Sequence, residues 1–150
     1  MVRAVQILTV LSGAGALLVA GVFAAFTWLV LPAFARTGPG AAAPVMQAVN
    51  VVAVRAPLMT ALFGTGACCL ALAVLALVSG RPGPAAGCAV YLVGCLGVTV
   101  AGNVPLNDAL ARGRVTDFAR WAAAWGRWNT VRLLACLATA AVLWGTSPDR

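Results

Sequence analysis

Residues 82–108, PGPAAGCAVYLVGCLGVTVAGNVPLND, decide the fold of this chain. No residue from 82 to 107 is charged, and roughly 20 apolar residues in a helix are enough to cross a bilayer. The stretch therefore predicts a membrane-spanning helix. It ends unusually, with Asn103, Asn107 and Asp108 around a proline. Polar groups at the edge of hydrocarbon are costly to desolvate, so this ending is a candidate functional element.

Three other stretches of the chain have a similar composition. Residues 4–35 and 56–80 carry no charge, and the gap 133–148 can span a bilayer only if its helix starts earlier, near Gly126. Of the 150 residues 9% are charged, against about 25% in soluble domains. The sequence therefore predicts one all-α domain over residues 1–150, a four-helix transmembrane bundle.

The spans are expected to end at helix-breaking or polar residues. Pro32 and Pro105 are expected to end the first and third spans, and Pro57 to kink the second, because proline removes a backbone donor. Aromatic residues at helical spacing from Phe118 to Trp125 predict a short interfacial helix in the third loop, before the fourth span. The predicted spans are residues 4–31, 45–79, 85–104 and 126–145.

The residue types limit the chemistry. The chain has no His, no Glu and no Lys, and its ten cations are all Arg. Without His, Glu or a C-x-x-C pair, neither a metal site nor a tightly bound cofactor is expected. The arginines form no basic run, so nucleic acid is not an expected partner. Five cysteines fall in the predicted spans, as expected of small buried packing residues.

With four crossings, the end of span one, the start of two, the end of three and the start of four share one membrane face. This polar end also carries more arginine than the opposite end, which has Arg3, Arg81 and Arg150. The positive-inside rule then places the polar end in the cytoplasm of a multi-pass protein of the inner (plasma) membrane. Its polar and aromatic residues are Trp28, Gln47, Asn50, Arg55, Asn103, Asn107, Asp108, Trp125, Trp128, Asn129 and Arg132.

Span four carries a stripe at positions i, i+3, i+4 and i+7, formed by Trp125, Trp128, Asn129 and Arg132. One interpretation is an aromatic belt with an arginine that reaches the interface. The other is an inward stripe that offers flat surfaces, an amide and a cation. A lipid-facing arginine inside the span would be expensive, so Arg132 favours the inward stripe.

The remaining polar residues also have two interpretations. Gln47 and Asn50 share a helix face, whereas Arg55 is either interfacial or part of a site. Asn103 and Asn107 either satisfy backbone groups freed near Pro105 or face a ligand. Asp108 is either an ion-pair partner of an arginine or a general base.

Three elements together resemble one protein family. They are Met46-Gln-Ala-Val-Asn50, Asn103-Val-Pro-Leu-Asn107-Asp108 and Trp125-x-x-Trp128-Asn129-x-x-Arg132, in this order on four spans. The chain resembles the anthrone oxygenase-like membrane proteins over nearly its whole length. The resemblance implies oxidation of an anthrone to an anthraquinone with O2, without metal or flavin, in aromatic polyketide pathways.

The resemblance gives the candidate residues roles. Trp28, Trp125 and Trp128 would hold the faces of a flat aromatic substrate, with Gln47, Asn50 and Arg55 as further substrate-binding residues. The developing oxyanion would be stabilised by hydrogen bonds, and Asp108 would take the proton. The residues expected to stabilise the oxyanion are Asn103, Asn107, Asn129 and Arg132. The expected partners are a hydrophobic aromatic small molecule and the lipid bilayer.

Two alternatives remain open at this point. The first is a non-catalytic membrane module that binds a hydrophobic ligand or a partner. The second is a cyclase or isomerase that acts on a similar substrate. The sequence does not predict the oligomeric state.

Overall fold

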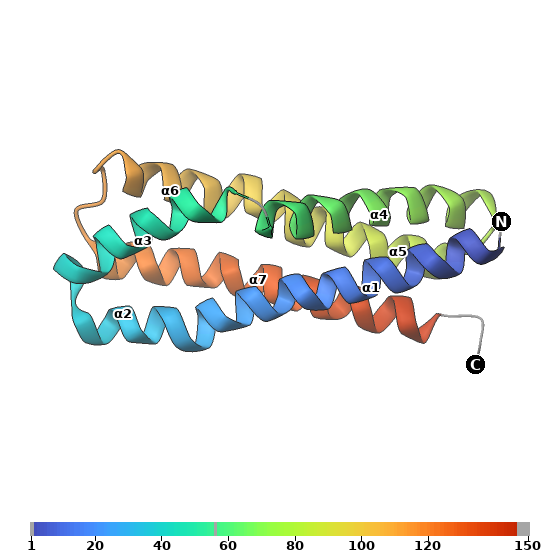
Figure 1. Ribbon diagram of the computed structural model, residues 1–150, viewed down its shortest axis with the longest axis horizontal. Helices are drawn as coiled ribbons and strands as arrows, with labels where there is room; N and C mark the ends of the chain where they lie inside the picture. Colours follow the sequence, from blue (N-terminus) through green and yellow to red (C-terminus); the bar gives the residue numbers. More distant parts are fainter. Residues whose placement is uncertain (1, 56, 147–150) are drawn as a thin grey trace.

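The computed structural model describes residues 2–55 and 57–146. They form an elongated helical bundle with four helices long and apolar enough to cross a membrane (Figure 1). The predicted architecture, an all-α four-helix bundle, is confirmed, and the chain is a multi-pass membrane protein. The four helices are Val2–Thr37, Leu58–Val78, Pro82–Ala111 and Phe118–Gly145.

The first helix runs through the proline that was expected to end it. Its parts are α1 (Val2–Ala25), a π-helical segment η1 (Phe26–Val30) and α2 (Leu31–Thr37). The predicted end at Leu31 is therefore wrong. Proline clashes with the carbonyl four residues back in a regular α-helix, and the wider π-helical turn just before Pro32 accommodates it.

The third helix repeats this arrangement. It consists of α5 (Pro82–Tyr91), the π-helical segments η2 (Leu92–Gly97) and η3 (Thr99–Asn103), and α6 (Val104–Ala111). The helix continues through Pro105 to Ala111, so the predicted end at residue 104 is also wrong. A π-helical segment again directly precedes the proline-containing turn, and it holds Asn103 inside the bundle.

The other two segments also differ from their expected bounds. The predicted second span is two helices, α3 (Pro39–Ala53) and α4 (Leu58–Val78), because the chain breaks before Pro57. The fourth helix, α7 (Phe118–Gly145), starts where the side chain of Asp117 accepts a hydrogen bond from the Arg120 amide. The expected interfacial helix is not a separate element, since its residues form the first turns of α7.

The main core lies where α1, α4, α5 and α7 pack around one another. Small residues allow close approach, as at Ala16 and Ala20 of α1, which are buried. Large apolar side chains cover the outside, among them Leu18, Phe63 and Val93. The buried side chains of the bundle include polar ones, which lie between the helices and not on the outer surface. This distribution suits a bundle whose surroundings are lipid.

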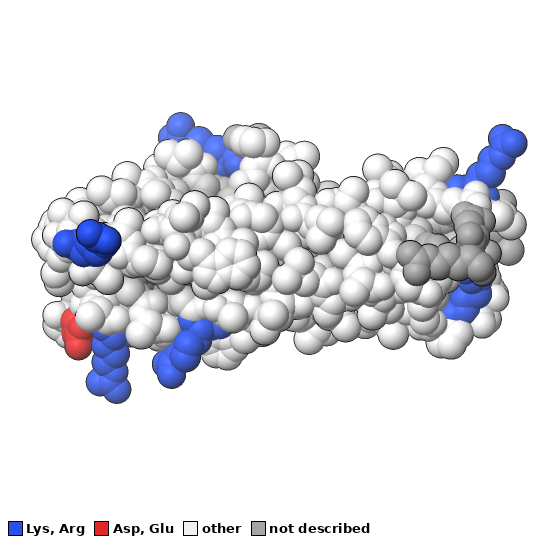
Figure 2. All heavy atoms as spheres, turned by 90° about the horizontal axis from the view of Figure 1, so that it is seen from below, with Lys and Arg blue, Asp and Glu red and all other residues white. Residues whose placement is uncertain are grey.

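The two ends of the bundle differ. At one end α1 begins and α7 ends, whereas α2, α3, α6 and the start of α7 gather at the other (Figure 1). We call this second end the polar end. A second apolar cluster fills it, built on buried Met46, Leu110, Trp121 and Trp125. On the face in Figure 2 the cations lie toward the two ends, and the middle is uncharged.

Candidate functional site

A cavity of about 180 Å³ lies between the helices, where the main core meets the apolar cluster of the polar end. This volume is smaller than the roughly 300–1,000 Å³ of pockets for drug-sized ligands, so the cavity suits a compact ligand. Its lining is apolar and aromatic apart from a few polar residues. These polar residues are Asn50, Thr99, Asn103, Asn107 and Arg132.

Arg132 supplies a buried cation to this cavity. It lies near the middle of the 28-residue α7, and its side chain is almost fully buried. Its Nη1 donates to Thr99 Oγ1 at 3.3 Å, and its Cζ lies 4.1 Å from the centre of the Phe23 ring. Its Nε, which is also buried, has no hydrogen-bond partner. The guanidinium is thus held in place with donor capacity left over.

Asn129 fixes the position of that guanidinium. Its Oδ1 accepts a hydrogen bond of 2.8 Å from Arg132 Nη2. Its Nδ2 donates to the carbonyl of Phe23 and to Thr27 Oγ1, both at 2.8 Å. The carbonyl of Phe23 lies one turn before the π-helical segment η1, where the backbone departs from α-geometry. Asn129 therefore links the first helix to the cation on α7.

No carboxylate of the described residues lines the cavity. Asp108 is exposed and pairs with Arg112 at 3.5 Å, and Asp117 caps α7 at the surface. The third acidic residue of the chain, Asp149, lies outside the described residues. The charge of Arg132 is therefore balanced by dipoles and aromatic faces, not by a described acid.

Asparagine side chains complete the polar lining. Asn103 is fully buried, and its Nδ2 donates to the carbonyl of Trp125 at 3.3 Å. Its Oδ1 has no partner, and neither has the buried Nδ2 of Asn50. Asn107 Oδ1 accepts from the indole of Trp125 at 2.8 Å. Buried polar atoms without partners are rare in proteins. These two and Arg132 Nε lie on residues of one cavity, so they mark it as a place that would hold a bound molecule, water or ligand.

Six of the eleven predicted site residues are thus brought together. Trp125 forms part of the wall, and Asn129 lies directly behind it. The predicted stripe on α7 splits, because Trp128 is on a neighbouring face, half exposed, against the backbone of Gly102. The six residues are Asn50, Asn103, Asn107, Trp125, Asn129 and Arg132.

The other predicted residues lie elsewhere. Trp28 is two-thirds exposed on the outer surface of η1. Gln47 Nε2 donates to the carbonyl of Leu110 at 2.8 Å, which ties α3 to α6. Arg55 is exposed in the break between α3 and α4. Together with Trp128 and Asp108, these residues do not line the cavity.

Several residues of the site were not among the sequence candidates. Phe23 and Phe26 line the cavity, and Thr27 and Thr99 accept hydrogen bonds from Asn129 and Arg132. Thr99 lies four residues before Asn103 on the same helix face, which was a usable signal. Phe23 and Phe26 gave no such signal in the sequence, because they resemble ordinary apolar residues of a span.

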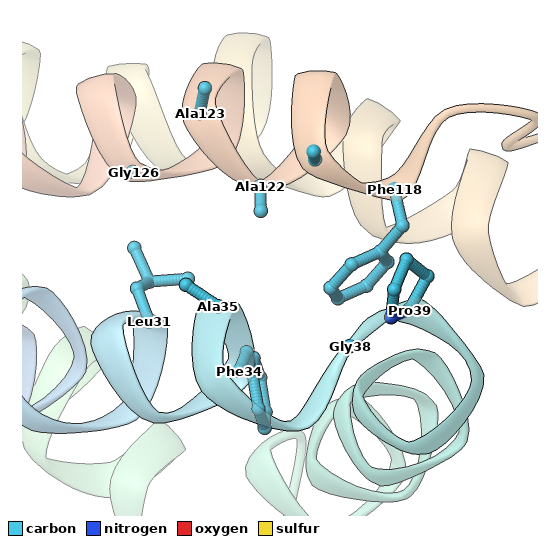
Figure 3. Close-up of a pocket in the computed structure, with 10 residues that line it drawn as sticks. Leu31, Phe34, Ala35, Gly38, Pro39, Phe118, Ala122, Ala123 and Gly126 are labelled. Atoms are coloured by element: carbon cyan, nitrogen blue, oxygen red, sulfur yellow. The ribbon is translucent and has the colours of Figure 1, made fainter.

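A larger hollow, of about 410 Å³, lies between α2 and α7 at the polar end. Figure 3 shows Leu31 and Phe34 on one side, opposite Ala122 and Gly126 of α7. Its lining is entirely apolar or glycine and includes none of the eleven candidates. Polar groups fix orientation and specificity in ligand sites, so we place the candidate site in the smaller cavity.

The comparisons with known proteins point to one family. No curated protein and no solved structure matches the chain significantly. A family model described as anthrone oxygenase matches residues 55–142. The matched region includes Asn103, Trp125 and Arg132, which meet at the cavity. The match covers more than half of the 150 residues, so the chain belongs to the anthrone oxygenase family.

Proposed function

We propose that this protein is a membrane-embedded oxygenase that uses O2 to oxidise a flat polycyclic aromatic substrate of the anthrone type. The observation that carries the proposal is the buried guanidinium of Arg132, which faces a cavity without a described carboxylate. A cation in an apolar site favours a ligand that bears or develops negative charge. An anthrone is such a ligand, since losing a benzylic proton gives an electron-rich enolate.

The lining suits the chemistry of that substrate, and the cavity of about 180 Å³ has to widen to admit a tricyclic ring. Phe23, Phe26 and Trp125 offer aromatic surfaces around the cavity. The unpartnered Nδ2 of Asn50 and Nε of Arg132 are donors for the enolate oxygen, and the unpartnered Oδ1 of Asn103 accepts from a phenol hydroxyl. Donors placed where charge develops are a strong source of catalysis in a site of low dielectric constant.

The reaction is balanced without a cofactor. The enolate gives one electron to O2, and the resulting pair combines to form a carbon–oxygen bond as a peroxide anion. Protonation gives a hydroperoxide, which loses the remaining benzylic hydrogen as a proton while the O–O bond breaks. One oxygen atom remains as the new carbonyl, and the other leaves as water. Arg132 would stabilise the enolate and then the peroxide anion.

The first proton has no carboxylate to receive it among the described residues that line the cavity. Asp108, the sequence candidate for the base, pairs with Arg112 at the surface. We propose instead that the proton leaves to water and that Arg132 favours the ionised substrate. The absence of His and Glu from the sequence supports a reaction without a protein-held metal.

The test uses the purified protein in lipid nanodiscs with an anthrone such as emodin anthrone. We expect O2 uptake above the uncatalysed rate and a product one oxygen heavier and two hydrogens lighter, with one atom of 18O from labelled O2. Chelator should change neither. Without catalysed O2 uptake the oxygenase proposal fails, and activity lost to chelator would exclude the cofactor-free mechanism.

A non-catalytic ligand-binding module is the second candidate. It is favoured by the use of Asn129 and of one side of Asn103 in hydrogen bonds that join helices. In that case the wild-type protein would show no turnover, and Asn103→Ala and Asn129→Ala would lower the yield of folded protein. A cyclase or isomerase would take up no O2, and its product would have the same elemental composition as the substrate or that composition less one water. Product mass therefore separates it from an oxygenase.

A further inference from the structure

A groove of about 610 Å³ runs along the outer surface of the bundle beside the cavity. It lies between α1 on one side and α3 and the start of α4 on the other. Arg55 is its charged residue, and the rest of its lining is apolar. The neighbouring surface is also apolar, with Val51 and Val54 exposed. The groove therefore faces the part of the surface that suits lipid.

This groove and the cavity share part of their walls. Five residues line both of them: Val22, Phe26, Val49, Ala53 and Leu58. Phe26 is half-buried in the π-helical segment η1, and its ring lies 5.4 Å from that of Trp125. One layer of side chains thus separates the groove from the polar atoms of the site.

The way from the polar end is more obstructed. The apolar cluster of Met46, Leu110, Trp121 and Trp125 fills the bundle there. Hydrogen bonds tie this cluster together, from Gln47 to the carbonyl of Leu110 at 2.8 Å and from Trp121 to the carbonyl of Leu106 at 2.9 Å. A ligand arriving along the bundle axis would have to break this packing.

We infer that the ligand reaches the cavity sideways from the bilayer, through the groove between α1 and the α3–α4 break, with Phe26 as the side chain that moves to admit it. The inference rests on the proposed function for the class of ligand. It narrows that class to molecules that partition into the membrane as a neutral weak acid and ionise beside Arg132. Beyond Arg55, an anion would meet only apolar side chains and a high desolvation cost on the way to the cavity.

The test separates a passage from a binding site by its kinetics. A plug in a passage slows entry and exit equally and leaves the dissociation constant unchanged, whereas damage to the site changes that constant. Ala48 and Val52 are exposed on α3 and line the groove but not the cavity. Ala48→Trp and Val52→Trp are therefore the plugs, two variants on separate turns in case one misfolds.

Ala41→Trp is the matched control. Ala41 is exposed on the same helix, two turns before Ala48, and lines neither the groove nor the cavity. The probe is 1,8-dihydroxyanthraquinone, a flat weak acid that does not react with O2. Its binding to protein in nanodiscs is followed after rapid mixing by the change in the probe's own visible absorption, since tryptophan fluorescence would also report on exposed Trp28 and on the introduced tryptophans.

We expect both plugs to lower the association and dissociation rate constants about tenfold, within the range that access effects cover, with Kd within about twofold of wild type. Ala41→Trp should leave both rates unchanged. Unchanged rates in the two plugs, or a changed Kd with an unchanged association rate, would overturn the lateral route. A wild-type protein that does not bind the probe would overturn both the route and the ligand class. Slowed binding without O2 uptake on an anthrone would support the route and refute the oxygenase.

Discussion

Arg132 donates a hydrogen bond of 2.8 Å to Asn129, so an amide, not a carboxylate, holds this buried guanidinium. The amide in turn donates to the carbonyl of Phe23 and to Thr27, which fixes its orientation. A carboxylate at this position would neutralise the cation. The amide orients it and leaves its charge available to a ligand.

Removing the guanidinium should separate function from folding. In Arg132→Gln we expect kcat/KM for an anthrone to fall by about 10²–10³, as for the loss of an oxyanion donor. The protein should still fold, because burying a charge without a counter-ion opposes folding. Arg127→Gln, at an exposed position of the same helix, is the control and should keep full activity. A collapse in yield confined to Arg132→Gln would instead assign the arginine a structural role.

Converting the amide to a carboxylate should weaken binding of acidic ligands. Asn129→Asp places a negative charge beside Arg132, and we expect Kd for 1,8-dihydroxyanthraquinone to rise at least about tenfold, or 1.4 kcal/mol. The variant also loses the donors to Phe23 and Thr27. Thr27→Val removes one of these hydrogen bonds without a charge, so its Kd should stay near that of wild type. Equal weakening in both variants would argue against the electrostatic role.

Asp108 should be dispensable. It is exposed and contributes an i,i+4 pair with Arg112 at 3.5 Å, an interaction of about 0.3–0.5 kcal/mol. In Asp108→Asn we therefore expect kcat/KM within about twofold of wild type and a small change in stability. Steady-state O2 uptake measures the first, and thermal unfolding in detergent the second. A loss of several orders of magnitude would restore Asp108 as the general base.

Gly102 lets the indole of Trp128 lie directly on the third helix. A Cβ atom at this position would come within 2.8 Å of Trp128 Cγ and Cδ2. Gly102→Ala should therefore displace the ring and destabilise the protein by about 1–3 kcal/mol. Gly64→Ala, where nothing lies within 4 Å of the added atom, should be neutral or slightly stabilising. Similar melting temperatures for the two variants would show that Trp128 can move freely.

The orientation of the bundle is open to a direct test. The polar end carries Arg36, Arg112, Arg114, Arg120 and Arg127, so we propose that it faces the cytoplasm of the plasma membrane. Cysteine placed at Gly40 or Val115 should resist an impermeant maleimide in intact cells, and cysteine at Arg3 or Pro82 should react. The reverse labelling would place the candidate site near the outside.

The sequence determined the architecture for a simple reason. Without water to satisfy backbone groups, a long uncharged segment in lipid has to be helical. Consecutive spans cross the membrane in opposite directions, so the end of one span and the start of the next lie on the same membrane face. The joint placement of Asn50, Asn103, Asn129 and Arg132 at one end of the spans followed from this. The spacing of the polar and aromatic residues gave the resemblance to the family, and the family model that matches residues 55–142 shows the membership.

The tertiary structure decided which of these residues meet. Pro32 and Pro105 look like helix ends in sequence, but each follows a π-helical segment that lets its helix continue. On α7, which is one continuous α-helix, packing against the other helices turns Trp125 and Arg132 toward the cavity and leaves Trp128 half exposed, and Trp28 is exposed on η1. Helical spacing gives angles around one axis. Which of those angles faces a neighbouring helix depends on packing, and packing is not encoded in any single span.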